Sequence, residues 1–175
     1  MSEYRLLRSR LAPLALACLV LSFLCSLPAT AREPDFVAHS KDLKCLATAV
    51  YFEARGEPLE GQVAVAQVVL NRLHSDRYPK TICGVVYQNA QLHNRCQFSF
   101  ACDGKPDIPR EADAWSRAES VAAAALANPE QIWVLGDATL YHARYVSPSW
   151  APKVTLVASI GQHLFYEEAG AGPEG

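Results

Sequence analysis

Three glutamates lie close together in the segment YFEARGEPLEG, residues 51–61, and each could take part in acid–base chemistry. Glu53 follows two aromatic residues, whereas Glu57 and Glu60 flank a proline and a leucine. A carboxyl group in water ionises at about pH 4, so a general acid at neutral pH needs surroundings that disfavour the charge. Which glutamate can serve therefore depends on the helices that carry them.

Two predicted helices flank this segment. Ser40 is a suitable N-cap and Asp42 lies in the first turn, so we expect a helix over about 41–54 that Gly56 ends. Its apolar residues recur at helical spacing: Leu43, Leu46, Val50 and Ala54. Pro58 suits the first turn of a second helix, which should reach about His74. Its apolar stripe consists of Leu59, Val63, Ala66, Leu70 and Leu73.

The ends of these helices separate Glu53 from Glu57. Glu53 falls in the last turn of the first helix, where the helix dipole and the neighbouring aromatic rings both raise the pKa of a carboxyl group. Glu57 falls at the entry to the second helix, where the dipole favours the charged form, so we expect a structural or substrate-orienting anion paired with Arg55. Glu60 would only solvate that helix. Ordinary helix-end residues are the alternative for all three.

The remaining sequence predicts a helical core followed by a small C-terminal β element, an α+β fold. Residues 82–87 form a short helical piece, 88–109 are irregular, and a third helix covers about 110–127. Its apolar face contains Trp115, Ala118, Ala122 and Leu126. The segment VTLVASIGQHLFYEE is typical of a hairpin, with Gly161 at the first central position of a type II′ turn.

The N-terminus resembles a secretory signal. Basic residues precede an apolar run over 11–27, and Ala29-Thr30-Ala31 supplies a small-residue cleavage site, so we interpret residues 1–31 as a signal peptide. The alternative is an uncleaved inner-membrane anchor formed by 11–27. We expect a tail over 32–42, one catalytic domain over 43–168 and a disordered tail over 169–175. A net charge of −2 gives no support for a nucleic-acid partner.

Four cysteines remain after such a cleavage: Cys45, Cys83, Cys96 and Cys102. An even number in an oxidising compartment favours two disulfides, for which three pairings exist. Cys96 and Cys102 could close a small loop, which would leave Cys45 with Cys83. A zinc site is not favoured, because the sequence contains neither C-x-x-C nor H-E-x-x-H.

Several segments together resemble the SleB-type cell wall hydrolases, the family of the spore cortex-lytic enzymes. They are YFEARGEPLEGQVAVAQVVLNRL (51–73), YPKTICGVVYQ (78–88), CQFSFACDG (96–104), ATLYHARYVSPSW (138–150) and IGQHLFY (160–166). The resemblance implies a lysozyme-like fold and cleavage of the β-1,4 bond between N-acetylmuramic acid and N-acetylglucosamine, with Glu53 as catalytic acid. The cysteines resemble those of exported Gram-negative members, which implies a periplasmic protein.

The reaction implied by the resemblance is lytic transglycosylation. A hydrolytic glycosidase needs a second carboxylate, and neither Glu57 nor Asp103 is convincing. In a transglycosylase the muramic acid 6-hydroxyl replaces water and yields a 1,6-anhydro end, so one glutamate suffices. A muramidase that uses Asp103 is the first alternative, and a non-catalytic peptidoglycan-binding protein is the second. A zinc amidase is the most distant, and no cofactor is expected.

Other residues of these motifs are candidates for binding the glycan. Gln97 and Ser99 could hydrogen-bond N-acetyl or hydroxyl groups, with loop structure as the alternative. Tyr141 and His142 could lie near the reacting sugar, and Trp150 offers a flat face for sugar stacking or for capping the core. The substrate-binding candidates are thus Glu57, Gln97, Ser99, Asp103, Tyr141, His142 and Trp150. Asn71 and Arg72 are expected to fix the second helix to its neighbours. The partner is peptidoglycan, with a membrane involved only if the signal segment stays.

Overall fold

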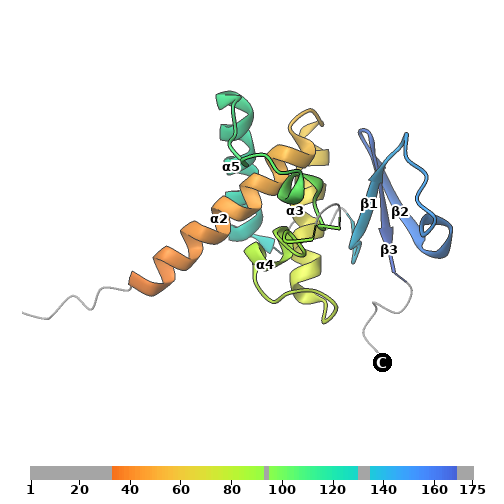
Figure 1. Ribbon diagram of the computed structural model, residues 1–175, viewed down its shortest axis with the longest axis horizontal. Helices are drawn as coiled ribbons and strands as arrows, with labels where there is room; N and C mark the ends of the chain where they lie inside the picture. Colours follow the sequence, from red (N-terminus) through yellow and green to blue (C-terminus); the bar gives the residue numbers. More distant parts are fainter. Residues whose placement is uncertain (1–32, 93–94, 130–134, 169–175) are drawn as a thin grey trace, which may run out of the picture. The chain divides into compact units, whose positions relative to one another are not determined.

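A computed structural model of the protein describes residues 33–92, 95–129 and 135–168, with side chains from residue 39 onward. Helices gather together and a small sheet lies beside them (Figure 1). The helices are α2 (Glu33–Ala54), α3 (Leu59–His74), α4 (Ile82–Val86), α5 (Ala112–Ala127) and the 3₁₀ turns η1 (Ser99–Cys102) and η3 (Ala151–Lys153). The strands are β1 (Leu140–Ala143), β2 (Thr155–Ile160) and β3 (His163–Glu167). The predicted α+β class, with the β element last, is confirmed.

Several predictions fall beyond this part of the chain. The signal segment 1–31, its apolar run 11–27 and the tail 169–175 lie outside the described residues. Within the described part, no helix has the length and apolar character that a membrane crossing requires.

Helix α2 ends at Ala54 as expected, but it begins at Glu33. The predicted N-cap at Ser40 is therefore wrong, and the segment expected to be a tail is helical. Pro34 is tolerated in a first turn, and no glycine or proline follows it until Gly56, so nothing in the sequence stops the helix earlier. His39, Ser40 and Lys41 on this helix are exposed.

Helix α3 lies at the centre of the packing. It starts directly after Pro58 and ends at His74, as predicted. Ala66, Val69 and Leu70 pack into the main core formed with the other helices. Ala64 and Val68 pack into a second core against the sheet. Because both faces of α3 are covered, this helix joins the helical region to the sheet.

The two later helices agree with the sequence pattern. Helix α4 matches the short helical piece, and α5 starts two residues after the expected Arg110. Ala118 and Ala122 are buried, and Trp115 and Leu126 pack against the same core. In the described residues of the segment between them, η1 is the only helix.

The helical region contains two disulfides. Cys45 on α2 is bonded to Cys83 on α4, and Cys96 is bonded to Cys102 across η1. This is the pairing suggested by the short spacing between Cys96 and Cys102. The second bond closes the loop that carries the buried rings of Phe98 and Phe100.

The sheet has the order β1-β3-β2, and both pairs are antiparallel. Gly161 has φ of 54°, and Gln162 does not share that sign, as a type II′ turn requires. Side chains alternate between the two faces of a strand, so the register divides them. Tyr141, His163 and Phe165 share one face, and Phe165 packs on α3 there. His142, Leu164 and Tyr166 lie on the opposite face.

Candidate active site

Glu53 and Tyr141 form the centre of the candidate site. Glu53 lies in the last turn of α2 and is half-buried. The Tyr141 hydroxyl on β1 donates a hydrogen bond to Glu53 Oε2 at 3.0 Å. Burial and the charge of Glu53 raise the pKa of Tyr141 well above its usual value, so its hydroxyl remains a donor. This hydrogen bond thus joins the end of α2 to strand β1 of the sheet.

Burial controls the ionisation of Glu53. Desolvation raises the pKa of Glu53 above its usual value, against the smaller effects of the Tyr141 hydrogen bond and the Arg72 charge, which lower it. A like charge a few ångströms away would raise that pKa as well. The charge of no described carboxylate is among the causes of the shift in the pKa of Glu53. Glu53 is thus a solitary carboxyl group held toward its protonated form, as the sequence predicts.

Arg72 lies behind this pair, almost completely buried. Its Nε donates to the Thr139 carbonyl oxygen at 2.7 Å. With the Gln97 amide oxygen turned toward it, Arg72 also donates from both terminal nitrogens, at 3.0 and 3.1 Å. The guanidinium lies over the rings of Tyr78 and Phe98, 5.4 and 5.2 Å from their centroids. Gln97, a predicted glycan ligand, is therefore engaged by a buried arginine.

Asn71 completes the link between α3 and the segment before β1. Its Nδ2 donates to the carbonyl oxygens of Gly136 and Ala138, at 2.8 and 2.9 Å. The prediction that Asn71 and Arg72 fix the second helix to its neighbours is confirmed. This link holds the start of β1, and thereby Tyr141, in place beside α2.

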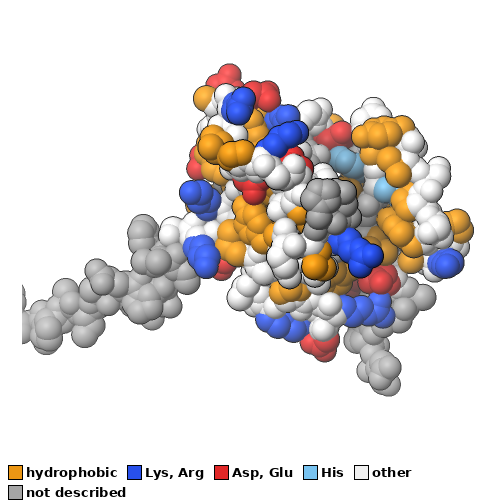
Figure 2. All heavy atoms as spheres, viewed as in Figure 1, with side chains coloured by type: hydrophobic (Ala, Val, Ile, Leu, Met, Phe, Trp, Pro, Cys, Tyr) orange, Lys and Arg blue, Asp and Glu red, His pale blue; other side chains and the backbone are white. Residues whose placement is uncertain are grey.

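His163 is a residue of this region that the sequence did not single out. It lies on the same face of the sheet as Tyr141, with ring centroids 5.2 Å apart. Its Nδ1 is buried without a hydrogen-bond partner among the described residues. Burial lowers the pKa of His163 below its usual value, which favours the neutral ring. Strand alternation in the predicted hairpin, counted from Gly161, was the signal that could have found it. Histidine side chains reach the surface over the sheet in Figure 2.

Glu57 has a structural partner across the chain. Its Oε2 accepts a hydrogen bond from the Gln162 backbone N–H at 2.8 Å, in the turn between β2 and β3. The expected pairing of Glu57 with Arg55 is wrong, because Arg55 Nε binds Glu111 Oε1 at 2.9 Å. The chain turns between the two helices at Gly56, so the neighbouring side chains reach different elements. Glu57 therefore fastens the hairpin turn to the start of α3.

This contact makes a prediction for Gly161. A Cβ atom at this position would overlap Glu57 Oε2 at 1.8 Å and approach Pro58 Cδ to 3.0 Å. The positive φ adds a penalty for any residue with a side chain. We expect Gly161→Ala to displace Glu57 and to lower the free energy of unfolding by about 1–3 kcal/mol. Denaturant unfolding measures this, with Gly104→Ala as the control, since Gly104 also has a positive φ but has no atom near its Cβ position.

His142 and Trp150 form a separate cluster. His142 Nε2 and the Tyr166 hydroxyl are 2.8 Å apart, and the two rings stack with centroids 5.2 Å apart. Trp150 contacts both rings edge-on, at 5.5 and 5.4 Å. Since His142 and Tyr141 are consecutive on β1, they point to opposite faces of the sheet. The structure does not bring His142 or Trp150 to Glu53.

The remaining predicted residues lie on the surface. Ser99 is exposed at the start of η1, and Glu60 is exposed in the first turn of α3. Asp103 follows η1, where its Oδ1 accepts the Lys105 backbone N–H at 2.9 Å. Asp103 lines a pocket beside α2 with Phe52 and Arg55, and Glu53 is absent from that lining.

The sequence is similar to a family of cell wall hydrolases, whose profile matches residues 56–166. The chain is 33% identical over 152 residues to the spore cortex-lytic enzyme of Bacillus subtilis (strain 168), covering 80% of this chain and 44% of that protein. It is 33% identical over 126 residues to the spore cortex-lytic enzyme of Oceanobacillus iheyensis, covering 71% of this chain and 41% of that protein. The chain thus spans less than half the length of these relatives.

Two solved catalytic domains resemble this structure. One is the catalytic domain of the germination-specific lytic transglycosylase SleB from Bacillus anthracis, with a TM-score of 0.57 and 32% identity, covering 72% of this chain and 93% of that one. The other is the catalytic domain of Bacillus cereus SleB, with a TM-score of 0.54 and 30% identity, covering 73% and 91%. The expected lysozyme-like α+β fold is confirmed. The matched range, residues 56–166, covers the positions of Tyr141 and His163 but begins after Glu53.

Proposed function

This chain belongs to the cell wall hydrolase family, and we propose that it is a peptidoglycan lytic transglycosylase with Glu53 as its acid and base. The bond broken is the β-1,4 linkage between N-acetylmuramic acid and N-acetylglucosamine. The similarity to the catalytic domain of the lytic transglycosylase SleB from Bacillus anthracis supports this reaction type. The observation that carries the proposal is the solitary, half-buried carboxyl group of Glu53, whose pKa is raised.

The reaction needs only one carboxyl group when the substrate supplies the nucleophile. Glu53 gives its proton to the glycosidic oxygen while the bond from that oxygen to C1 of muramic acid breaks. The 6-hydroxyl oxygen of the same sugar then bonds to C1, and the Glu53 carboxylate takes the proton that this hydroxyl loses. The products are an N-acetylglucosamine end and a 1,6-anhydro-muramic end. Glu53 is restored, and no water is consumed.

Tyr141 is the residue that positions the acid. Its hydroxyl donates a hydrogen bond to Glu53 Oε2, so Oε1 is the oxygen that carries the proton to the substrate. The same hydrogen bond stabilises the carboxylate that exists between the two proton transfers. The proposed site therefore consists of Glu53 as catalytic residue and Tyr141 as its positioning partner.

The products distinguish this reaction from hydrolysis. Purified protein is incubated with peptidoglycan, and the released muropeptides are identified by mass spectrometry. Transglycosylation gives 1,6-anhydro-muramic ends, which are lighter by one water than the reducing ends left by a muramidase. Reducing ends alone would show that the enzyme is a muramidase. Binding without any release would show a non-catalytic peptidoglycan-binding protein.

The raised pKa of Glu53 predicts the direction of the pH dependence. The first step requires the protonated acid, so activity should fall as the pH rises through the pKa of Glu53. Because burial raises that pKa, the alkaline limb should lie above the pH at which an ordinary glutamate ionises. The limb is measured as kcat/KM against pH on soluble glycan strands. A limb centred at the pKa of a free glutamate would contradict the assigned environment of Glu53.

The substrate also bears on where the protein acts. Peptidoglycan lies outside the cytoplasm, so an enzyme that cleaves it is exported. The N-terminal signal-like sequence and the two disulfides support export into an oxidising compartment. We place the protein in the periplasm of a Gram-negative bacterium. Fractionation of cells that express the full chain, followed by detection of the mature N-terminus, tests this placement.

A further inference from the structure

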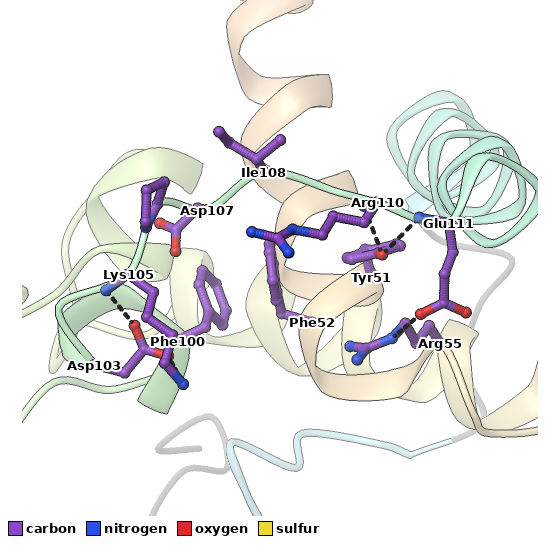
Figure 3. Close-up of a pocket in the computed structure, with 11 residues that line it drawn as sticks. Tyr51, Phe52, Arg55, Phe100, Asp103, Lys105, Asp107, Ile108, Arg110 and Glu111 are labelled. Atoms are coloured by element: carbon purple, nitrogen blue, oxygen red, sulfur yellow. Dashed lines mark hydrogen bonds and ion pairs between the residues drawn. The ribbon is translucent and has the colours of Figure 1, made fainter.

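A pocket lies beside the C-terminal turns of α2, next to the proposed catalytic residue in sequence (Figure 3). Its volume of about 340 Å³ falls within the range of small-ligand pockets, roughly 300–1,000 Å³. Phe52 on α2 and Arg55 just after it form one wall, and the segment from Asp103 to Glu111 forms the other. Phe52 directly precedes Glu53 in the sequence, although Glu53 itself is not part of the lining.

The walls of this pocket are held in place by interactions within the protein. The Phe52 and Phe100 rings stack, with centroids 4.9 Å apart, and give the pocket an aromatic floor. The Tyr51 hydroxyl accepts the backbone N–H groups of Arg110 and Glu111, at 3.0 and 3.1 Å. These hydrogen bonds fasten the outer segment to α2. The pocket is therefore preformed.

Three cations and three carboxylates line the pocket, and the third carboxylate, Asp107, is hydrogen-bonded to the Tyr87 side chain. The remaining pairs leave Arg110 as the available cation. Arg55 is paired with Glu111, and Lys105 lies 3.8 Å from Asp103. Among the described residues, Arg110 forms neither an ion pair nor a side-chain hydrogen bond. Figure 3 shows its guanidinium extending from the backbone back over the pocket. A guanidinium that lines a partly aromatic pocket, without a carboxylate of its own, is suited to bind a carboxylate ligand.

We propose that this pocket binds the peptide stem of the muramic acid residue that reacts at Glu53, with Arg110 holding a stem carboxylate. This inference rests on the proposed function. The stem starts from the lactyl group of the sugar whose C1 is attacked, and it carries free carboxylates. An extended peptide advances about 3.3–3.6 Å per residue, so two or three residues reach around the side of a helix about 10 Å wide. The aromatic floor then packs against the aliphatic part of the stem.

The test compares glycan strands with and without peptide stems. Amidase treatment removes the stems and leaves the glycan intact. Wild-type protein should cleave stem-bearing strands with a kcat/KM about tenfold higher than stripped strands, the size expected for a charge-assisted contact. Arg110→Gln should lose this preference while cleaving stripped strands at the wild-type rate. Arg117→Gln, at an exposed arginine of α5 outside the pocket, should behave as wild type.

Two outcomes would overturn the pocket assignment while leaving the proposed reaction intact. They are equal cleavage of both substrates by the wild type, and an equal loss on both substrates in Arg110→Gln. A readout without catalysis separates this inference from the proposed function. A synthetic stem tripeptide added to labelled protein should shift the backbone amide signals of Phe52, Lys105 and Arg110, and these shifts should vanish in Arg110→Gln. Unchanged signals in the wild type would refute the site even if the glycan is cleaved.

Discussion

Replacing Glu53 with glutamine is expected to lower the rate of muropeptide release by a factor of at least about 10²–10⁴, the contribution of a general acid. Glutamine has the same shape and can still accept the Tyr141 hydrogen bond, but it cannot give a proton to the glycosidic oxygen. Because the same group also removes the 6-hydroxyl proton in the second step, both steps lose their catalyst. The rate is measured as anhydro-muropeptides released from purified peptidoglycan.

The neighbouring glutamates supply the controls. Glu60→Gln changes an exposed side chain in the first turn of α3, so its activity should equal the wild-type activity. Glu57→Gln keeps an oxygen that can accept the Gln162 N–H, so we expect at most a moderate loss. If Glu57→Gln were inactive and Glu53→Gln remained active, the wrong carboxylate would have been chosen.

The stability of the Glu53→Gln variant gives an independent check on the environment of Glu53. A pKa raised by burial means that the folded state holds this proton at pH values where the unfolded chain has released it. The wild type therefore loses stability as the pH rises through this window, from the unfolded pKa upward past the folded pKa. A neutral glutamine has no such dependence. The Tm of the variant should equal that of the wild type at low pH and exceed it above the window.

The local signals in the sequence predicted the position of Glu53 well. Gly56 and Pro58 are strong signals of a helix end and a helix start, and α2 ends and α3 begins where they indicate. These residues act through backbone geometry within one turn, so their effect does not depend on the rest of the fold. Ser40 is different, because a serine can cap a helix but does not require one to begin. Helix α2 runs through it.

Partners distant in the sequence could not be predicted from the same signals. Glu57 binds the Gln162 backbone, and Arg55 binds Glu111. Proximity in the sequence had instead favoured a pair between Arg55 and Glu57. A contact of this kind depends on how the hairpin packs on α3. The position of His142 follows from strand register: the motif names it beside Tyr141, but alternation on β1 turns the two to opposite faces. His163 joins Tyr141 for the same reason.

Loss of Arg72 is expected to produce the largest effect on stability. The side chain is 2% exposed and donates to the Thr139 carbonyl oxygen and the Gln97 amide oxygen. Arg72→Ala removes these donors and leaves a cavity between Tyr78 and Phe98. An unpaired buried acceptor costs about 1–3 kcal/mol and the cavity adds to this cost, so we expect the free energy of unfolding to decrease by about 3–5 kcal/mol. Denaturant titration monitored by circular dichroism measures it.

Two further variants separate the causes of this loss. Arg77→Ala removes an arginine whose side chain is 51% exposed and which pairs with Glu168 at 3.1 Å, so it should change the stability by less than about 0.5–1 kcal/mol. Arg72→Met fills much of the cavity but donates no hydrogen bond. If the network matters, the methionine variant should remain clearly less stable than wild type, because the Thr139 carbonyl stays unpaired. Full recovery of stability in Arg72→Met would instead assign the whole effect to packing.

The same methionine variant also tests whether Arg72 acts on the acid. The Arg72 charge lowers the pKa of Glu53, against the larger effect of burial. Removing this charge should therefore raise the pKa of Glu53 further and move the alkaline limb of kcat/KM to higher pH. A purely structural role for Arg72 would lower activity at every pH without moving the limb. A displaced limb would show that the buried arginine, besides joining α3 to the sheet, sets the pH range in which Glu53 can give up its proton.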